Sequence, residues 1–195
     1  MNNIDDFFRS FGMSGYLATD DLRNIEKKFH VELGHVPTIE TQTPIDYYPQ
    51  FEQEVRAEAA EMARHFEVFY CLERSIRSLI TETFQESLGE MWWDSGKIPQ
   101  AITSAVTDRQ RRELDSGMTR RSDLAIDYTT FGELSVIITS NWELFSIVLK
   151  STKAVERVMN NLNMLRGPIA HCCPISEDEV LRLRIAVKDW FRLIG

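Results

Sequence analysis

Two side chains near the end of the sequence, Arg166 and His171, could together cleave a phosphodiester. They stand five positions apart, with Pro168 between them. If the 2′-hydroxyl of RNA is the nucleophile, cleavage needs a group that takes a proton, a group that gives one and a cation beside the phosphate, but no metal ion. Histidine suits proton transfer because its ordinary pKa of about 6.5 lies near neutral pH. The planar guanidinium of arginine can donate two hydrogen bonds to phosphate oxygens, so the pair points toward RNA cleavage.

The spacing of this pair limits how it could act. Five residues along an ideal α-helix turn by about 500°, which leaves the two side chains about 140° apart. Pro168 removes the amide donor to Met164, so we expect a kink or a break of the helix between the two residues. A kink could bring Arg166 and His171 together. Alternatively two copies of the chain share the site, which we favour because a two-fold axis beside the motif places two of each residue around one cleft. In a plainer interpretation Arg166 is a surface cation near a helix C-terminus, and His171 is a capping or packing residue.

The pair follows a predicted helix over residues 153–166, whose apolar residues recur at helical spacing. A longer helix is predicted to begin near Phe51, because apolar residues recur every three or four positions and no Gly or Pro interrupts before Gly89. We expect about ten turns, ended by the turn that holds Trp92 and Trp93. These tryptophans could stack bases, but packing at the helix end is the interpretation we prefer. The apolar stripe of the long helix consists of Val55, Ala59, Met62, Phe66, Phe69, Ile76, Ile80 and Phe84.

Further helices are predicted from their start signals. A hydroxyl side chain three residues before a glutamate allows both side chains to satisfy amide donors of a first helical turn. The pairs with this spacing are Thr130–Glu133, Ser140–Glu143 and Ser176–Glu179. We therefore expect helices over 131–138, 141–149 and 177–193, besides one over 100–114. No strand pattern or internal repeat is visible, so the sequence predicts an all-α fold, an up-and-down helical bundle.

The first 50 residues differ from the rest. Thr19 followed by two aspartates suits a helix start, and a short helix to about His30 is expected. Prolines then punctuate a polar segment, which predicts an extended linker. These prolines are Pro37, Pro44 and Pro49. The sequence thus divides into an N-terminal arm with a linker, 1–50, and a helical domain, 51–195.

Composition and charge restrict the classes of function. The formal net charge of −8 argues against a protein that coats nucleic acid non-specifically. Residues 150–171 depart from this balance with four Lys and Arg against one glutamate, which is either a solvated helix face or a surface that suits contact with RNA at one place. No stretch is long and apolar enough for a membrane span, and no basic N-terminal signal region is visible, so we expect neither a membrane nor a secretory role.

The cysteines and histidines predict neither disulfides nor a metal site. Cys71, Cys172 and Cys173 give an odd count without zinc-like pairing, which favours a reducing, cytoplasmic setting. We expect Cys172 and Cys173 to be small buried thiols beside the candidate site. The histidines form no ligand cluster with them, and no glycine-rich phosphate loop is present. We therefore expect no metal and no cofactor.

Several segments of the chain together resemble one known superfamily. In the block 129–171 the similar residues are Thr129–Ile138, Asn141-Trp142, Leu162–Arg166 and Ala170-His171. Upstream they are Glu73–Arg77, Trp92-Trp93 and Pro99. These segments are similar to the HEPN branch attached to a eukaryotic RNA-surveillance endonuclease, over about residues 55–193. HEPN domains are helical bundles whose hallmark is Arg, four to six residues, then His.

The resemblance to HEPN domains implies an activity, an assembly and a site. It implies a metal-independent endoribonuclease that forms a homodimer with the motifs facing each other across the axis. Arg166 would contact the scissile phosphate, and His171 would be the general base or acid. Many active members have a polar residue, often Asn, directly after the motif arginine, where this chain has Gly167. Asn163, on the same helical face as Arg166, could supply the missing amide or form a structural hydrogen bond between helices. The capping role of Glu133 explains that residue adequately.

The sequence therefore predicts a HEPN ribonuclease that acts on RNA as the effector of a toxin or antiviral-defence system, with an antitoxin or a sensor protein as a further partner. One alternative is a non-catalytic HEPN module that binds RNA or docks a partner protein, which Gly167 and the acidic charge favour. Another is an interaction domain whose 1–50 arm clasps a neighbouring subunit.

Overall fold

The computed structural model describes residues 19, 21–22, 24–26, 28–29 and 50–194. The chain divides into two units, 1–50 and 51–195, and each is described by itself. In the first unit the described residues from Thr19 to Phe29 are helical, in agreement with the predicted helix. The predicted linker with its three prolines lies outside the described residues. The candidate site belongs to the second unit, the helical domain.

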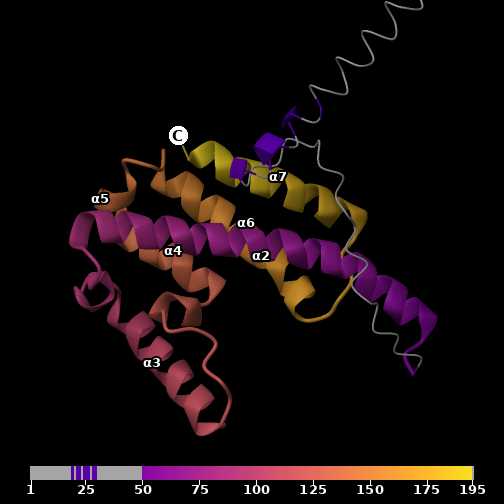
Figure 1. Ribbon diagram of the computed structural model, residues 1–195, viewed down its shortest axis with the longest axis horizontal. Helices are drawn as coiled ribbons and strands as arrows, with labels where there is room; N and C mark the ends of the chain where they lie inside the picture. Colours follow the sequence, from indigo (N-terminus) through magenta and orange to yellow (C-terminus); the bar gives the residue numbers. More distant parts are fainter. Residues whose placement is uncertain (1–18, 20, 23, 27, 30–49, 195) are drawn as a thin grey trace, which may run out of the picture. The chain divides into compact units, whose positions relative to one another are not determined.

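Helix α2, Gln53–Leu88, forms the long spine of the helical domain (Figure 1). It matches the predicted uninterrupted helix, and it ends at Gly89, whose φ of 79° favours glycine. Its buried residues begin at Phe69, near the middle of the helix, and continue to Phe84. Val55 and Phe66 belong to the predicted apolar stripe, yet they are 55% and 58% exposed. The periodicity thus predicts the helix but not its burial, because it does not show whether another element covers the apolar face.

The turn after α2 places a tryptophan in the core. It contains the short 3-10 helix η1, Trp92–Asp94. Trp92 is buried and stacks on Phe84 of α2, with ring centroids 4.9 Å apart and ring planes 15° from parallel. Trp93 meets Trp92 edge-on at 5.4 Å. The predicted packing role is therefore confirmed for Trp92.

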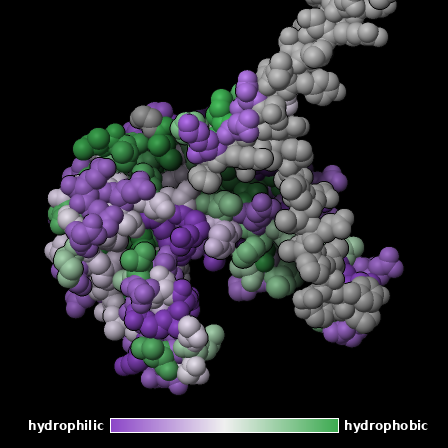
Figure 2. Space-filling model, viewed as in Figure 1, coloured by the Kyte–Doolittle hydropathy of each residue, from purple (hydrophilic) through white to green (hydrophobic). Residues whose placement is uncertain are grey.

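Helix α3, Gln100–Asp115, follows this turn and matches its predicted range to within one residue. It packs through Ile102 and Val106, and it contacts the 3-10 helix η2, Ala125–Tyr128. Hydrophilic residues cover much of the α3 end of the molecule in Figure 2. The helix is therefore amphipathic, with a narrow buried face.

Helix α4, Phe131–Ser140, begins with the predicted capping box. The Thr130 hydroxyl accepts a hydrogen bond from the Glu133 amide, and the Glu133 carboxylate accepts one from the Thr130 amide at 2.6 Å. Four of its residues are buried, so this short helix lies deep in the core. The start signal in the sequence is confirmed here.

The second predicted capping box, at Ser140, is wrong. Ser140 is the last residue of α4, and the next helix, α5, covers only Trp142–Phe145. Asn141 between them is buried and donates to the Ile137 carbonyl at 2.9 Å. With this buried amide α4 ends two residues later than expected, and the predicted helix over 141–149 shrinks to a single turn.

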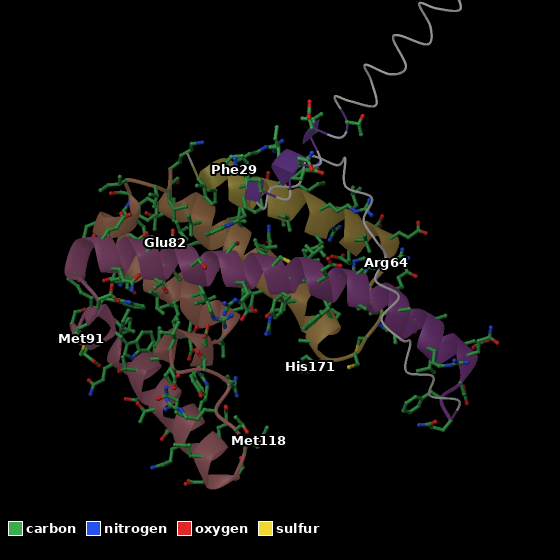
Figure 3. The ribbon with its side chains drawn as sticks, in the orientation of Figure 1. Phe29, Arg64, Glu82, Met91, Met118 and His171 are labelled. Atoms are coloured by element: carbon green, nitrogen blue, oxygen red, sulfur yellow. The ribbon has the colours of Figure 1, made fainter. Side chains whose placement is uncertain are left out.

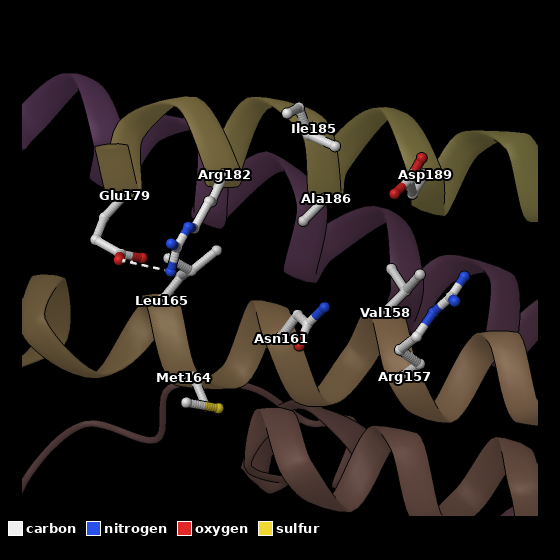
Figure 4. Close-up of a pocket in the computed structure, with 10 residues that line it drawn as sticks. All are labelled: Arg157, Val158, Asn161, Met164, Leu165, Glu179, Arg182, Ile185, Ala186 and Asp189. Carbon is white, nitrogen blue, oxygen red and sulfur yellow. Dashed lines mark hydrogen bonds and ion pairs between the residues drawn. The ribbon is translucent and has the colours of Figure 1, made fainter. Parts of the chain in front are cut away.

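Helix α6, Thr152–Ala170, is the central helix and packs against α2, α4 and α7. Helix α7, Glu177–Leu193, has the predicted ends and runs antiparallel to α6 (Figure 4). The Ser176 hydroxyl caps α7 by accepting from the Glu179 amide, as predicted. The Glu179 carboxylate, however, bonds to Arg182 at 3.1 Å.

The helices enclose one apolar core. Within the described residues no strand forms, and an isolated antiparallel bridge joins Leu149 to Ile194. This bridge ties the chain before α6 to the end of α7. The predicted all-α helical bundle is confirmed. Among the described residues no helix is long and apolar enough to cross a membrane.

Candidate active site

Helix α6 continues through Pro168 and ends at Ala170, so the expected break of the helix is wrong. Pro168 removes one hydrogen bond, the one to the Met164 carbonyl, while its fixed φ is compatible with helix. Because it lies two residues from the helix end, few bonds remain beyond it to be lost. The helix therefore carries Arg166 inside its last turns and places His171 just outside.

The turn that follows α6 has the hydrogen bonds of a Schellman motif. His171 is the C-cap residue, and Cys172 adopts a left-handed conformation with φ of 55°. The Cys172 amide bonds to the Ile169 carbonyl at 3.4 Å, and the Cys173 amide bonds to the Pro168 carbonyl at 2.9 Å. This pattern satisfies carbonyls that the helix end would leave free, and it fixes the backbone of His171.

The His171 side chain is exposed, and it makes no hydrogen bond to any residue that the structure describes. Figure 3 marks His171 at the turn after α6. The capping interpretation thus holds for the backbone of His171 and leaves its imidazole available. Cys172 and Cys173 are exposed rather than buried, which corrects the expectation of small buried thiols. They lie in the turn beyond the helix, where no element among the described residues covers them.

The Arg166 guanidinium is tied to α2 by one hydrogen bond. Its Nε donates to the Glu73 carboxylate at 3.2 Å, across 93 positions of sequence. The Arg166 side chain is 38% exposed, whereas Glu73 is 14% exposed. The two Nη nitrogens of Arg166 make no hydrogen bond within the described part of the chain. Glu73 therefore orients the guanidinium from one side and leaves its outer nitrogens accessible.

Glu73 is itself held in place by Arg77, one turn further along α2. Arg77 Nη2 donates to the second Glu73 carboxylate oxygen at 2.6 Å. The same arginine donates to the carbonyls of Ile126 at 3.2 Å and Thr129 at 2.9 Å. Glu73 thus joins the end of α6 to the segment around η2. In the sequence Glu73 belongs only to the HEPN-like segment, and no spacing rule pairs it with Arg166.

A surface hollow of about 240 Å³ opens beside Arg166. Its lining includes Phe66, Tyr70, Arg74, Arg77, Arg166 and Ala170. His171 is absent from this lining, although it directly follows Ala170. A single chain therefore places the predicted arginine and histidine at the same helix end but not in the same hollow.

Asn163 lies on α6 opposite the first turn of α4. Its Nδ2 would stand 3.9 Å from a Cβ atom added to Gly132, and its side chain is exposed. It makes no hydrogen bond to any described residue, so the expected structural bond between helices does not form here. Asn163 is not part of the lining of the hollow beside Arg166.

A second arginine–glutamate pair lies between α3 and α4. Arg109 donates to both oxygens of Glu133 at 2.8 Å and to the Tyr128 carbonyl at 2.8 Å. Burial acts to raise the pKa of Glu133, but the hydrogen bonds from Arg109 and Thr130 outweigh it and lower the pKa. The hydrogen bond to Glu133 raises the pKa of Arg109. Glu133 is therefore a structural residue, as its capping role predicts.

No group of three or more His, Cys, Asp or Glu side chains that could hold a metal ion lies among the described residues. His30 and His35 fall outside those residues.

The model of one protein family matches residues 67–195 and is described as Swt1-like HEPN. The match contains the whole arrangement described above, from Glu73 to His171. Comparison with curated proteins found no match, and neither did comparison with solved structures. HEPN membership supports a ribonuclease-like or RNA-binding module and an all-α bundle. The chain therefore belongs to the Swt1-like HEPN family.

Proposed function

We propose that this protein is a metal-independent endoribonuclease of the HEPN type. The observation that carries the proposal is the geometry of Arg166. One Nε–carboxylate bond of 3.2 Å to Glu73 orients its guanidinium, while the outer nitrogens remain accessible. A guanidinium fixed in this way can donate two charge-assisted hydrogen bonds to a phosphate as its charge develops.

The proposed reaction is an internal transfer at phosphorus. His171 as general base takes the proton of the 2′-hydroxyl, whose oxygen attacks the adjacent phosphorus. The bond from phosphorus to the 5′-oxygen breaks, and a proton delivered by a histidine restores the 5′-hydroxyl. Arg166 stabilises the negative charge on the phosphorane. Asn163 lies on the same helix outside the lining of the hollow, and its exposed side chain would supply an amide donor from that side. The products are a 2′,3′-cyclic phosphate and a 5′-hydroxyl, and no metal ion takes part.

A homodimer is part of the proposal. The hollow beside Arg166 is not lined by His171 of the same chain, and the His171 imidazole is exposed without a described partner. Two copies related by a two-fold axis beside the α6 ends would place Arg166 of one copy near His171 of the other. Each composite site would then hold both groups.

The first test is cleavage of RNA in EDTA by the purified full chain, beside Arg166→Ala and His171→Ala. We expect both variants to lose at least about a hundredfold in rate, because each removes a transition-state interaction. Arg184→Ala is the matched control, since Arg184 is an exposed arginine on α7 outside the hollow. If the wild-type protein and His171→Ala degrade RNA equally, the activity is contamination and the proposal fails.

A second test addresses the shared site. Arg166→Ala and His171→Ala are unfolded together, refolded as a mixture and assayed. In a mixed dimer one composite site keeps both Arg166 and His171, so we expect part of the activity to return. A site within one chain would leave the mixture inactive.

In the cell, we propose that the protein acts in the cytoplasm as an effector of a toxin or antiviral-defence system, with an antitoxin or a sensor protein as its partner. Expression without that partner should slow growth, and His171→Ala should relieve the effect. The identity of the neighbouring gene is the simplest further observation.

A non-catalytic HEPN module that binds RNA or docks a protein is the second candidate. Gly167 favours it, because the residue after the motif arginine supplies no polar side chain. The Glu73 carboxylate also neutralises part of the Arg166 charge. This candidate predicts that RNA is bound but not cleaved and that expression is harmless.

A further inference from the structure

Two aromatic rings on α2 are exposed beside the candidate site. Phe66 is 58% and Tyr70 is 59% exposed, and both line the hollow next to Arg166. Their ring centroids are 6.2 Å apart with planes tilted by 40°, so the rings do not stack on each other. Two exposed aromatic side chains one helical turn apart form a contiguous patch, which marks an interaction site more often than a single exposed ring does.

The charge of the same hollow favours an anionic ligand. Three arginines line it against the single carboxylate of Glu73, in a protein whose formal net charge is −8. The arginines are Arg74, Arg77 and Arg166. Arg74 and Arg77 both pair with Asp127, at 3.4 and 3.9 Å, and Arg77 also bonds to Glu73, whereas the outer nitrogens of Arg166 face no described partner. A phosphate beside Arg166 would therefore meet a positive surface.

Two other hollows of similar size lack this combination. The one between α6 and α7, of about 290 Å³, has two arginines against two carboxylates and no aromatic ring (Figure 4). The one at η1, of about 270 Å³, has both Trp92 and Trp93 but only acidic charged side chains in its lining. Its acidic residues are Glu90, Asp94 and Asp123. Negative charge there would repel a phosphate backbone. Of these three hollows, the one beside Arg166 therefore combines exposed aromatic rings with positively charged side chains.

We propose that Phe66 and Tyr70 form a stacking platform for one unpaired base of single-stranded RNA, next to the phosphate held by Arg166. The inference rests on the proposed function and adds its substrate class. Bases stack on aromatic side chains with little dependence on their identity, so the platform favours unpaired RNA rather than a defined sequence. A hollow of about 240 Å³ holds a single base but no duplex, whose bases stay inside their own stack.

The test measures binding of the full chain in a His171→Ala background, which blocks cleavage. The probes are a labelled twelve-nucleotide RNA of mixed sequence, its duplex with the complement and the same strand with abasic nucleotides. We expect the single strand to bind more tightly than the duplex or the abasic strand. Tyr70→Ala and Phe66→Ala should each weaken binding of the single strand about ten- to a hundredfold, the effect of losing one stacked base.

Two further variants serve as controls. Tyr70→Phe keeps the ring and should bind within threefold of the parent. Phe191→Ala removes an exposed aromatic residue from α7, outside the hollow, and should also bind like the parent. Light scattering of every variant reports the mass in solution.

Three outcomes would overturn the platform: Tyr70→Ala binding as tightly as the parent, the abasic strand binding as well as the intact strand, or no measurable binding of any RNA. A change of mass in Tyr70→Ala with unaltered RNA affinity would instead assign this surface to contact between copies, which also overturns it. Cleavage assays separate the two proposals. Cleavage that depends on His171 without an effect of Tyr70 on affinity rejects the platform alone. Tyr70-dependent binding without any cleavage rejects the ribonuclease alone.

Discussion

The two arginine–glutamate pairs of the helical domain use the same chemistry in opposite ways. Arg109 meets Glu133 through two bonds of 2.8 Å and adds a third to the Tyr128 carbonyl. Arg166 meets Glu73 through a single bond of 3.2 Å from Nε. Both Nη nitrogens of Arg109 bond within the fold, whereas neither Nη nitrogen of Arg166 bonds to a residue that the structure describes. A positioned but unsaturated cation is what a phosphate-binding site requires.

The carboxylates of the two pairs differ in the same way. Glu133 closes a helix start, so all of its bonds join adjacent elements of the fold. Glu73 divides its oxygens between Arg77, which ties it to the η2 segment, and Arg166. Removing Arg109 should therefore lower the stability of the packing between α3 and α4. Removing Arg166, where α6 packs on α2, should lower activity.

The largest expected difference is between Arg109→Ala and Arg166→Ala. Arg166→Ala should lower kcat/KM for RNA by about 10²–10³-fold, because it removes charge stabilisation in the transition state. Its free energy of unfolding should change by less than about 1 kcal/mol, since the pair is partly solvent-exposed. Arg109→Ala should lower that free energy by about 2 kcal/mol, because it leaves the Glu133 carboxylate and a carbonyl without their donor. Urea unfolding and RNA cleavage measure the two quantities.

Similar behaviour of the two variants would contradict this difference between the two pairs. Arg166→Ala with a stability loss equal to that of Arg109→Ala would make both pairs structural. Cleavage by Arg109→Ala is measured under conditions in which circular dichroism shows the variant folded, and we expect near-normal kcat/KM there.

Glu73→Gln tests whether that carboxylate positions Arg166. One amide oxygen cannot replace two carboxylate oxygens that bond to Arg77 and Arg166. We expect kcat to fall about tenfold, equivalent to about 1.4 kcal/mol, and KM to change less than threefold, because the guanidinium remains present but is poorly aligned. Glu82→Gln, an exposed change on the same helix (Figure 3), is the matched control. Equal kcat for Glu73→Gln and the wild-type protein would show that Arg166 needs no such partner.

Sequence patterns predict the bounds of the helices in this domain better than they predict the tertiary contacts and burial of those helices. Helix α7 begins and ends at the predicted residues, because Ser176 marks its start and apolar residues recur along its length. At Ser140 the same start signal misleads, since a buried Asn141 extends α4 instead. Local spacing describes a first turn, but it does not reveal a competing tertiary contact. The exposed Phe66 on α2 shows the same limit for an apolar stripe.

In the candidate site, too, some residues can be predicted from the sequence and others cannot. Arg166 and His171 are visible in the sequence because they lie five residues apart. Glu73 is not visible as their partner, since 93 positions separate it from Arg166 and only packing of α2 on α6 brings them together. The turn at Cys172 could not be foreseen either, because glycine rather than cysteine usually marks a left-handed C-terminal residue.

The pH dependence of unfolding tests whether the Glu133 carboxylate stabilises the fold through Arg109. Burial opposes ionisation of Glu133, but its hydrogen bonds from Arg109 and Thr130 prevail, so its pKa in the folded state lies below the ordinary value of 4.5. A lowered pKa stabilises the folded state above the ordinary value, and this stabilisation is lost as the pH falls through the folded pKa. Glu133→Gln should therefore be about 1.5 kcal/mol less stable at pH 7, with a difference that shrinks below pH 4.5. Urea unfolding between pH 7 and pH 3 measures this difference in the free energy of unfolding between Glu133→Gln and the wild-type protein.

The control is the same substitution in an Arg109→Ala background. If the two residues act as a pair, their coupling energy should be present at pH 7 and should vanish at low pH. No coupling between Arg109 and Glu133 at pH 7 would show that Glu133 stabilises α4 through its helix-capping bonds alone.

The smallest expected effect lies at the open end of α6, where the backbone rather than a side chain is constrained. Cys172 has a φ of 55°, which costs a residue with a Cβ atom about 1–2 kcal/mol, while glycine loses about 0.5–1 kcal/mol through its freedom in the unfolded chain. Cys172→Gly should therefore raise the free energy of unfolding by about 0.5–1 kcal/mol, measured in urea. Cys172→Ala keeps the Cβ atom and should give no gain. Cys173→Gly, at a neighbouring exposed cysteine without positive φ, should lower stability. A gain from Cys172→Ala equal to that from Cys172→Gly would locate the cost in the thiol, and the turn that holds His171 would then be free of backbone strain.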